Sequence, residues 1–134
     1  MYLFDTNIFL EILLNQEEAQ SCQTALTKTS QIQSGWLTTF SLHAIEAIVS
    51  RTKQYKVLEE FLSALDLHPH LFCYATTIEE ELEAAHLAPS LRLDFDDALQ
   101  YYVAHKKKLT LVTLDRDFSK LHDIQVCSPR DLYR

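Results

Sequence analysis

The sequence predicts an α/β fold built on a parallel sheet, and two similar segments carry this prediction. The chain opens with the strand formers Tyr2–Phe4, followed by Asp5 and then by an apolar helical pattern, so the order is strand, turn, helix. Near the other end, the β-branched and aliphatic run Leu109–Thr113 is also followed by acids, Asp115 and Asp117. If the two strands are parallel neighbours, their acids converge at the carboxyl edge of the sheet, where open α/β folds bind ligands.

The length and composition fit a single domain that spans residues 1–134. A hydrophobic content of 47% is enough to bury one core of ordinary size. The apolar runs are far shorter than the roughly 18 residues of a membrane span, and no signal-peptide pattern is present, so we expect a cytoplasmic protein. Cys22, Cys73 and Cys127 have no CxxC spacing, which argues against disulfides and a thiolate metal site and predicts buried thiols.

The first half of the chain supplies a weakly patterned helix, a strand and an amphipathic helix. The first helix covers Glu17 to about Thr29, and Trp36–Thr39 is a short strand candidate. Ser41 is expected to cap the next helix, whose apolar stripe repeats at helical spacing. Glu46 stands at the border of that stripe and points partly toward the core. An alternative is that its stem packs while its carboxylate reaches water, and these residues alone leave both open.

The middle of the chain is rich in helical pattern. The run Val57–Leu65 follows a helical period up to the break at His68–His70, whose histidines lack a third ligand nearby and are expected to be solvated loop residues. A short strand is expected at Phe72–Ala75. Thr77–Glu80 has the form of a capping box, so a helix is expected to start there and to end at about Ala88, before a proline.

A further amphipathic helix is expected within Leu93–Ala104, with Asp94 at or near its cap. Asp94 and Asp97 are three residues apart, so their side chains can meet on one face of the first turn. Capping explains part of the presence of Asp94. It does not explain three aspartates in four residues that lead directly into the second strand with acids.

The grouped acids predict a divalent metal site. Several carboxylates brought together repel one another, and burial beside an apolar stripe makes their ionised forms still more costly. A cation among them removes that cost, and oxygen ligands without Cys or His partners favour Mg²⁺ or Mn²⁺. A metal-activated water beside a neutralised leaving oxygen is the arrangement for phosphodiester hydrolysis, with one or two ions.

The net charge of −7 disfavours a polyanionic partner only if that charge is spread evenly. Two bound divalent ions, with four positive charges, would reduce it to −3. Lys106, Lys107 and Arg116 are then available to hold nucleic-acid phosphates. The lysines also have a simpler interpretation, as a solvated helix end that is favourably placed on the helix dipole.

Four motifs resemble the PIN-domain family, and most closely the VapC-type toxins of prokaryotic toxin–antitoxin pairs. The segment Asp5–Asn7, the acid Glu46, the segment Asp97–Leu99 and the run Thr113–Phe118 are similar to the ordered acidic motifs of that family. Each motif alone would occur by chance in many proteins. Together they follow the family's order at family-like spacing and cover essentially the whole chain.

This resemblance implies a three-layer α/β/α sandwich around a central parallel sheet. It also implies an endoribonuclease that depends on Mg²⁺ or Mn²⁺, that hydrolyses RNA phosphodiester bonds, and that is the toxin of a type II toxin–antitoxin pair. Members are often homodimers and are usually held inactive by a small antitoxin protein. Exposed aromatic residues such as Tyr55 and Tyr101 would suit a dimer interface.

The resemblance also assigns roles to individual residues. The catalytic acids of the family match Asp5, Glu46, Asp97 and Asp115, and the metal ligands match Asp5, Asp97, Asp115 and Asp117. Accessory positions that orient the carboxylates match Thr6, Asn7, Thr113 and, in some members only, Asp94. Two departures concern substrate contacts: Lys106–Lys108 stands where many members have glycine, and Leu114 where a polar or basic residue is common.

Two other classes of function remain as alternatives. A Mg²⁺-dependent phosphoacceptor domain also places aspartates at strand ends, but Asp5 lacks an acid two residues later and no lysine follows a late strand in the receiver manner. The second alternative is a catalytically silent PIN-like module that binds RNA or protein. The presence of all the matched acids argues against it.

Overall fold

The computed structural model describes residues 1–133, apart from the side chain of residue 32, and within them five parallel strands form one sheet in the order β3-β2-β1-β4-β5. The strands are β1 (Tyr2–Phe4), β2 (Gly35–Thr38), β3 (Leu71–Tyr74), β4 (Thr110–Val112) and β5 (Val126–Cys127). The helices are α1 (Thr6–Leu13), α2 (Ala19–Ile32), α3 (Thr39–Arg51), α4 (Tyr55–Leu67), α5 (Ile78–Leu91) and α6 (Phe95–Lys107). Two short 3₁₀ helices, η1 (Arg116–Lys120) and η2 (Pro129–Leu132), flank β5.

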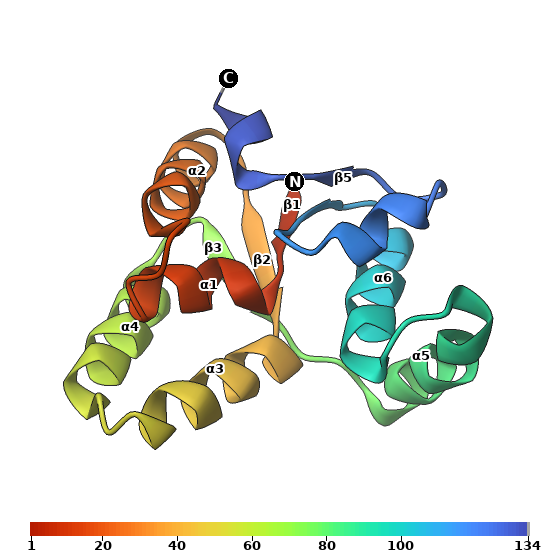
Figure 1. Cartoon of the computed structure of the whole chain (residues 1–134), viewed down its shortest axis with the longest axis horizontal. Coiled ribbons are helices and arrows are strands. Elements are labelled where there is room, and N and C mark those ends of the chain that lie inside the picture. Colours follow the sequence, from red (N-terminus) through yellow and green to blue (C-terminus); the bar gives the residue numbers. More distant parts are fainter. Residues whose placement is uncertain (134) are drawn as a thin grey trace.

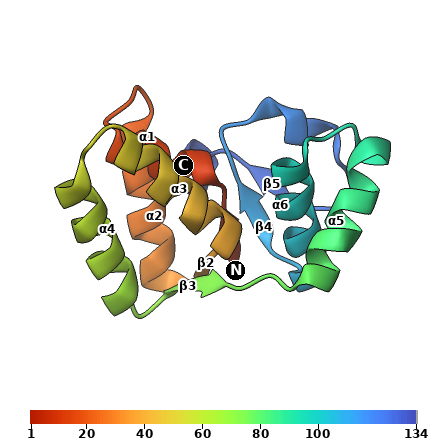
Figure 2. The same cartoon turned by 90° about the horizontal axis from the view of Figure 1, so that it is seen from below.

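The helices cover both faces of the sheet, which confirms the three-layer α/β/α prediction (Figure 1). Successive strand residues point to opposite faces. Leu3 and Leu111 therefore pack with α5 and α6, whereas Phe4 and Val112 pack with residues of α1, α2 and α3. Figure 2 shows the same division from below, with α1–α4 on one side of the strands and α5 and α6 on the other.

The strand order places a topological switch point between β1 and β4. From β1 the chain adds β2 and β3 on one side, and it later returns to add β4 and β5 on the other. β1 and β4 are parallel neighbours, with Phe4 opposite Val112, and the backbone N–H of Asp5 donates to the Val112 carbonyl at 3.0 Å. Open α/β sheets bind their ligands at this kind of point, so the predicted convergence of the two strand ends is confirmed.

The helix after β2 starts earlier than expected, because its cap is Thr38 and not Ser41. Thr38 has an extended backbone, and its side-chain oxygen accepts a hydrogen bond from the Ser41 N–H at 3.0 Å. Ser41 thus occupies the third position of the helix. Both residue types are good caps, and the choice depended on where β2 ends.

The expected end of α5 before Pro89 was wrong, since the helix continues to Leu91 with the proline inside its last turn. A proline removes one backbone donor, and in the last turn this loss interrupts little of the helix. Arg92 is the C-cap that follows the helix, and it takes a left-handed conformation with φ 55°. The predicted capping box at the other end, between Thr77 and Glu80, is confirmed.

Two expectations about burial were wrong, namely that Tyr101 is exposed and that Cys73 is a buried thiol. Tyr101 is only 8% exposed, and its hydroxyl donates to Asp123, so it is not available for an interface, whereas Tyr55 is 59% exposed. Cys22 is buried, but Cys73 is exposed because β3 is an edge strand. Strand β5, two residues long, was too short to be recognised from its pattern. Within residues 1–133, no helix is both long enough and apolar enough to cross a membrane.

Candidate active site

Asp5 lies at the carboxyl end of β1 and caps α1, and its side chain is held on both oxygens. Oδ1 accepts from the Thr6 N–H at 2.7 Å and from Gln100 Nε2 at 3.3 Å. Oδ2 accepts from the Thr113 hydroxyl at 2.6 Å and from Asn7 Nδ2 at 3.3 Å. Asp5 is only 6% exposed, so these four donors replace the water that an ionised carboxylate would otherwise keep.

The same hydrogen bonds fix the loop that follows β4. The Thr113 hydroxyl oxygen accepts from the Asp115 N–H at 3.0 Å, and Asn7 Oδ1 accepts from the Leu114 N–H at 3.4 Å. The structure therefore brings together Asn7 and Thr113, two of the residues that the sequence assigned to accessory roles. They join the end of β1 to the loop that carries Asp115.

Three further acids form the candidate metal site beside Asp5. Oxygens of Asp97, in the first turn of α6, and of Asp115 and Asp117, at the start of η1, all lie within 4.8 Å of one another. The Asp117 N–H donates to Asp115 Oδ1 at 2.9 Å, which orients that carboxylate. The set contains only carboxylate oxygens, and this donor set fits a hard cation such as Mg²⁺ or Mn²⁺.

The electrostatics of the acids agree with that fit. Burial, together with the negative charges of Asp96, Asp115, Asp5 and Asp94, raises the pKa of Asp97 to about 7. Burial also raises the pKa of Asp5, although the Thr113 hydrogen bond opposes this. Carboxylates that repel one another in this way are stabilised in the ionised form by a cation placed among them.

Glu46 lies on α3 and is not among the three acids whose oxygens converge. The buried side of α3 that faces the site is marked by Ser41, whose Oγ contacts Thr6 and Gln100. Glu46 is five residues further on, which turns it about 140° around the helix. It is half-buried, and its negative charge raises the pKa of the Cys73 thiol in β3, although partial burial of that otherwise exposed residue raises this pKa more. A catalytic role for Glu46 stays a prediction from the resemblance.

Asp94 and the lysines take different positions along α6. Asp94 is exposed at the N-cap, without a side-chain cap hydrogen bond, and its charge acts on Asp97. Lys106 and Lys107 lie in the last turn of the same helix, roughly 15 Å along the axis from Asp97 at 1.5 Å per residue. Lys106 Nζ donates to Glu80 Oε2 at 3.0 Å. The structure therefore places both lysines away from the acids.

Two residues of the site were missed in the sequence. Ser41, with no exposed surface, was taken only as a cap, and Gln100, 3% exposed, was not considered at all. Gln100 could have been found, because it lies three residues after Asp97 and thus on the same face of α6. A polar residue at such a position needs a partner.

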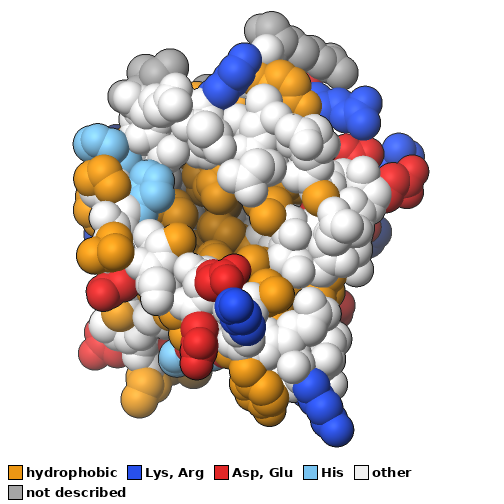
Figure 3. Space-filling view, turned by 90° about the vertical axis from the view of Figure 1, so that its left-hand side faces the viewer, with side chains coloured by type: hydrophobic (Ala, Val, Ile, Leu, Met, Phe, Trp, Pro, Cys, Tyr) orange, Lys and Arg blue, Asp and Glu red, His pale blue; other side chains and the backbone are white. Residues whose placement is uncertain are grey.

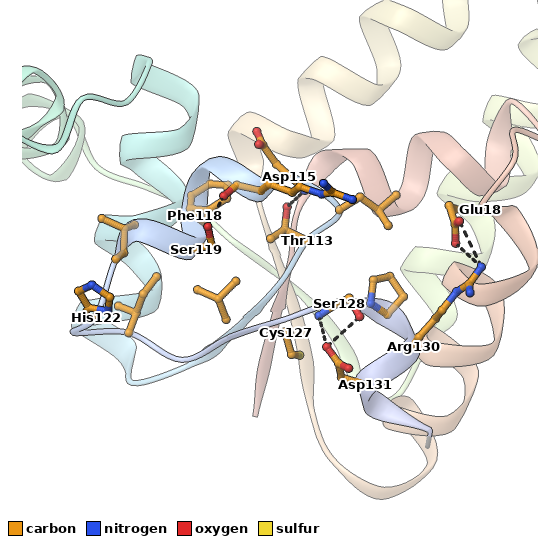
Figure 4. Close-up of a pocket in the computed structure, with 16 residues that line it drawn as sticks. Glu18, Thr113, Asp115, Phe118, Ser119, His122, Cys127, Ser128, Arg130 and Asp131 are labelled. Atoms are coloured by element: carbon orange, nitrogen blue, oxygen red, sulfur yellow. Dashed lines mark hydrogen bonds and ion pairs between the residues drawn. The ribbon is translucent and has the colours of Figure 1, made fainter.

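A hollow of about 800 Å³ lies next to the acidic site, under η1 (Figure 4). Thr113 and Asp115 lie along one rim of the hollow, and Ser128 and Asp131 lie along the opposite rim. The backbone N–H and the hydroxyl of Ser128 both donate hydrogen bonds to Asp131. One end is closed by the ion pair between Arg130 and Glu18 at 3.3 Å. Arg116, next to Asp115, is exposed and also lines the hollow.

The fold is similar to that of several solved toxin–antitoxin proteins. A toxin–antitoxin complex from Klebsiella pneumoniae matches with a TM-score of 0.73 and 18% identity, over 96% of this chain and 98% of that one. VapBC2 from Rickettsia felis, bound to a promoter DNA fragment, matches with a TM-score of 0.74 and 18% identity, over 95% of this chain and 97% of that one. VapC20 from Mycobacterium tuberculosis, a toxin that cleaves the sarcin–ricin loop, matches with a TM-score of 0.76 and 15% identity, over 93% of this chain and 99% of that one.

No curated protein sequence matches this chain. The sequence itself, however, matches the PIN domain family over residues 2–124. That range contains β1, β4 and the acids that these strands bring together with α6. The parallel sheet, the acidic site at its switch point and the match over nearly the whole sequence lead to one conclusion: the chain belongs to the PIN-domain family.

Proposed function

We propose that this protein is a Mg²⁺- or Mn²⁺-dependent endoribonuclease and the toxin of a toxin–antitoxin pair. The observation that supports the nuclease most strongly is the convergence of the Asp97, Asp115 and Asp117 oxygens within 4.8 Å, beside the buried Asp5. Such a cluster is costly without a cation. Its place at the open edge of the sheet leaves it accessible to a polymeric substrate.

Some residues of the site would bind the ion, and others orient the carboxylates that bind it. Asp97, Asp115 and Asp117, together with Asp5, would hold the metal. A divalent ion bound there supplies a water of lowered pKa and positive charge toward the leaving 3′ oxygen. Thr113 keeps the Asp5 carboxylate in place through a 2.6 Å hydrogen bond. Hydrolysis of this kind would leave 5′-phosphate and 3′-hydroxyl ends on the RNA.

Arg116 is the basic residue best placed to contact an RNA phosphate. It directly follows Asp115 in the chain, is exposed, and lines the hollow under η1. An arginine can bind a phosphate through two parallel N–H groups. We therefore propose that RNA passes from the acidic site along this hollow. Lys106 and Lys107 would contact it only if the RNA reached the far end of α6.

Cleavage of total RNA by the purified protein, in Mg²⁺, Mn²⁺ or EDTA, tests the nuclease. We expect cleavage in either metal and none in EDTA. Asp115→Asn should reduce the rate by at least 100-fold, because it removes a charge and nearly keeps the shape. A matched control is Asp123→Asn, since Asp123 is an acid outside the site that bonds Tyr101.

Equal cleavage by Asp115→Asn would exclude this site as the source of activity. If the wild-type protein cuts no RNA and yet binds Mn²⁺ through Asp115, the silent binding module becomes the better interpretation. Formation of a stable aspartyl phosphate on Asp5 would instead support the phosphoacceptor class.

An apolar groove supports the proposal of an antitoxin partner. It has a volume of about 340 Å³, lies between α1, α2 and α4, and appears in Figure 3 as a recess with hydrophobic side chains at its floor. Its lining includes Phe9, Leu13, Leu26, Phe61 and Leu65. Such a groove fits the apolar face of an amphipathic helix, and two of the similar structures are toxin–antitoxin complexes.

Growth of cells that produce the protein tests this partner. Production should arrest growth, and co-production of a candidate antitoxin from a neighbouring gene should restore growth. Ala64 lines the groove, so Ala64→Arg should remain toxic but escape neutralisation. Neutralisation of Ala64→Arg to the wild-type level would show that the partner does not use this groove.

We also propose a homodimer, as the family resemblance implies. Ile78 and Leu82 lie one turn apart on α5 and are 86% and 69% exposed. Large apolar side chains exposed side by side are typical of interaction surfaces. Light scattering should give the mass of two chains for the wild type and of one chain for Leu82→Glu.

A further inference from the structure

Gln100 is a buried polar residue whose contacts are not explained by packing. It lies on α6 between the buried residues Leu99 and Tyr101, and it is only 3% exposed. Its Nε2 donates to Ser41 Oγ at 2.7 Å and to Asp5 Oδ1 at 3.3 Å. Its Oε1 is buried and finds no donor among the described residues. An apolar side chain of the same length would fill this space without leaving an oxygen unpaired.

The orientation of the Gln100 amide follows from its neighbours. An ionised carboxylate can only accept hydrogen bonds, so the amide turns its NH₂ group toward Asp5 and leaves Oε1 unpaired. Ser41 Oγ also accepts from the Thr6 hydroxyl at 2.8 Å. Gln100 and Ser41 therefore form one buried connection from α6 to the start of α1, where Asp5 caps the helix.

Gln100 links the Asp5 carboxylate to the helix that carries Asp97. Of the four donors to Asp5, Thr6 and Asn7 belong to α1 and Thr113 follows β4. Within residues 1–133, Gln100 is the donor to Asp5 that comes from α6, the helix that also carries Asp97. It is the group that ties the Asp5 carboxylate to the helix of the neighbouring acid.

We propose that Gln100, acting through Asp5 and Ser41, is a positioning residue of the metal site. It fixes Asp5 Oδ1 relative to Asp97, so that the carboxylates are already arranged when the ion binds. Residues that orient metal ligands in this way typically change the affinity for the metal by 10- to 100-fold when they are replaced. The inference rests on the proposed metal-dependent function, since it assumes that these acids hold an ion.

Calorimetric titration of the intact protein with Mn²⁺ alone tests the proposal. Gln100→Met keeps the length of the side chain and removes its donor, and we expect the Kd for Mn²⁺ to rise by 10- to 100-fold. The Tm of the metal-free protein should change little, because removal of the unpaired Oε1 offsets the loss of the Nε2 donor to Asp5 and Ser41. Tyr101→Phe is the matched control: it deletes a buried hydroxyl one residue away that bonds Asp123, so it should leave the Kd unchanged.

Ser41→Ala is a second variant that removes the other half of the connection. It should weaken Mn²⁺ binding as Gln100→Met does, and the double variant should be no weaker than the weaker single variant, since both act on one carboxylate. If the wild type binds Mn²⁺ and both Gln100→Met and Ser41→Ala bind it with unchanged affinity, the positioning role of Gln100 is overturned. The proposed metal-dependent function is then unaffected. A wild type that binds no Mn²⁺ would overturn the metal-dependent function and this inference together.

Discussion

At the scale of single residues, the site combines one acid whose two oxygens both accept hydrogen bonds with another that is surrounded by like charges. Asp5 accepts four hydrogen bonds, whereas Asp97 is half-buried among like charges that, with burial, raise its pKa to about 7. The Asp5 carboxylate is therefore held in one position. Asp97 carries the repulsion that a bound cation would relieve.

The raised pKa of Asp97 predicts a pH-dependent stability of the metal-free protein. The ordinary value is 3.8 and the folded value about 7, so the folded state binds the proton more tightly and loses stability as pH rises through this window. Asp97→Asn removes that loss. In EDTA, its Tm should exceed that of the wild type at pH 8, and the difference should shrink toward pH 5. A constant difference across this range would contradict the raised pKa.

At the scale of elements, the register of α3 decides which of its residues reach the acids. Ser41, Ile45 and Val49 follow one another at four-residue spacing and are fully buried. This line of residues faces the core and, at Ser41, the site. Glu46 lies beside the line, so the family resemblance and the geometry lead to opposite expectations for it.

The geometry predicts that Glu46→Gln has little effect. We expect its Kd for Mn²⁺ to stay within about threefold of the wild type, because Glu46 is not among the main charges that raise the pKa of Asp5 or of Asp97. Asp115→Asn, measured beside it in the same titration, should lose binding. A loss of affinity in Glu46→Gln comparable to that in Asp115→Asn would restore the assignment made from the sequence.

A substitution at the end of α6 that lies far from the acids should affect stability and leave activity unchanged. At the far end from the acids, burial would raise the pKa of Glu80, but hydrogen bonds from Tyr74, Thr77 and Lys106 outweigh it and lower the pKa to about 2. Lys106→Met removes one donor from this 5% exposed acid. Urea unfolding should show a lower free energy of unfolding than the wild type, with RNA cleavage unchanged. Reduced cleavage at unchanged stability would instead indicate a substrate contact.

At the scale of the whole molecule, the candidate site joins parts of the chain that are far apart in sequence. Asp5 ends β1, Asp97 begins α6, and Asp115 and Asp117 follow β4. The two cores on either side of the sheet hold these elements in place. An ion bound between them would therefore stabilise the folded state as a whole.

This arrangement predicts a large thermal shift on metal binding. At 100 times its Kd, Mn²⁺ should add about 2.7 kcal/mol of stability, which is roughly 5–15 °C in Tm for a domain of this size. Scanning calorimetry with and without Mn²⁺ measures the shift. Asp115→Asn should show no such increase, and an equal increase in that variant would mean that the ion binds elsewhere.

The sequence by itself determined the elements and the acids at their ends. Strand formers followed by an aspartate predicted β1 with Asp5, and the same pattern predicted β4 with Asp115, because local periodicity and strand ends are properties of neighbouring residues. The tertiary structure alone decided which distant side chains meet. It placed Lys106 at the far end of α6 from Asp97, and it joined Asp5 to Gln100 and Gln100 to Ser41. These contacts depend on helix register and on packing across the sheet, which no short stretch of sequence specifies.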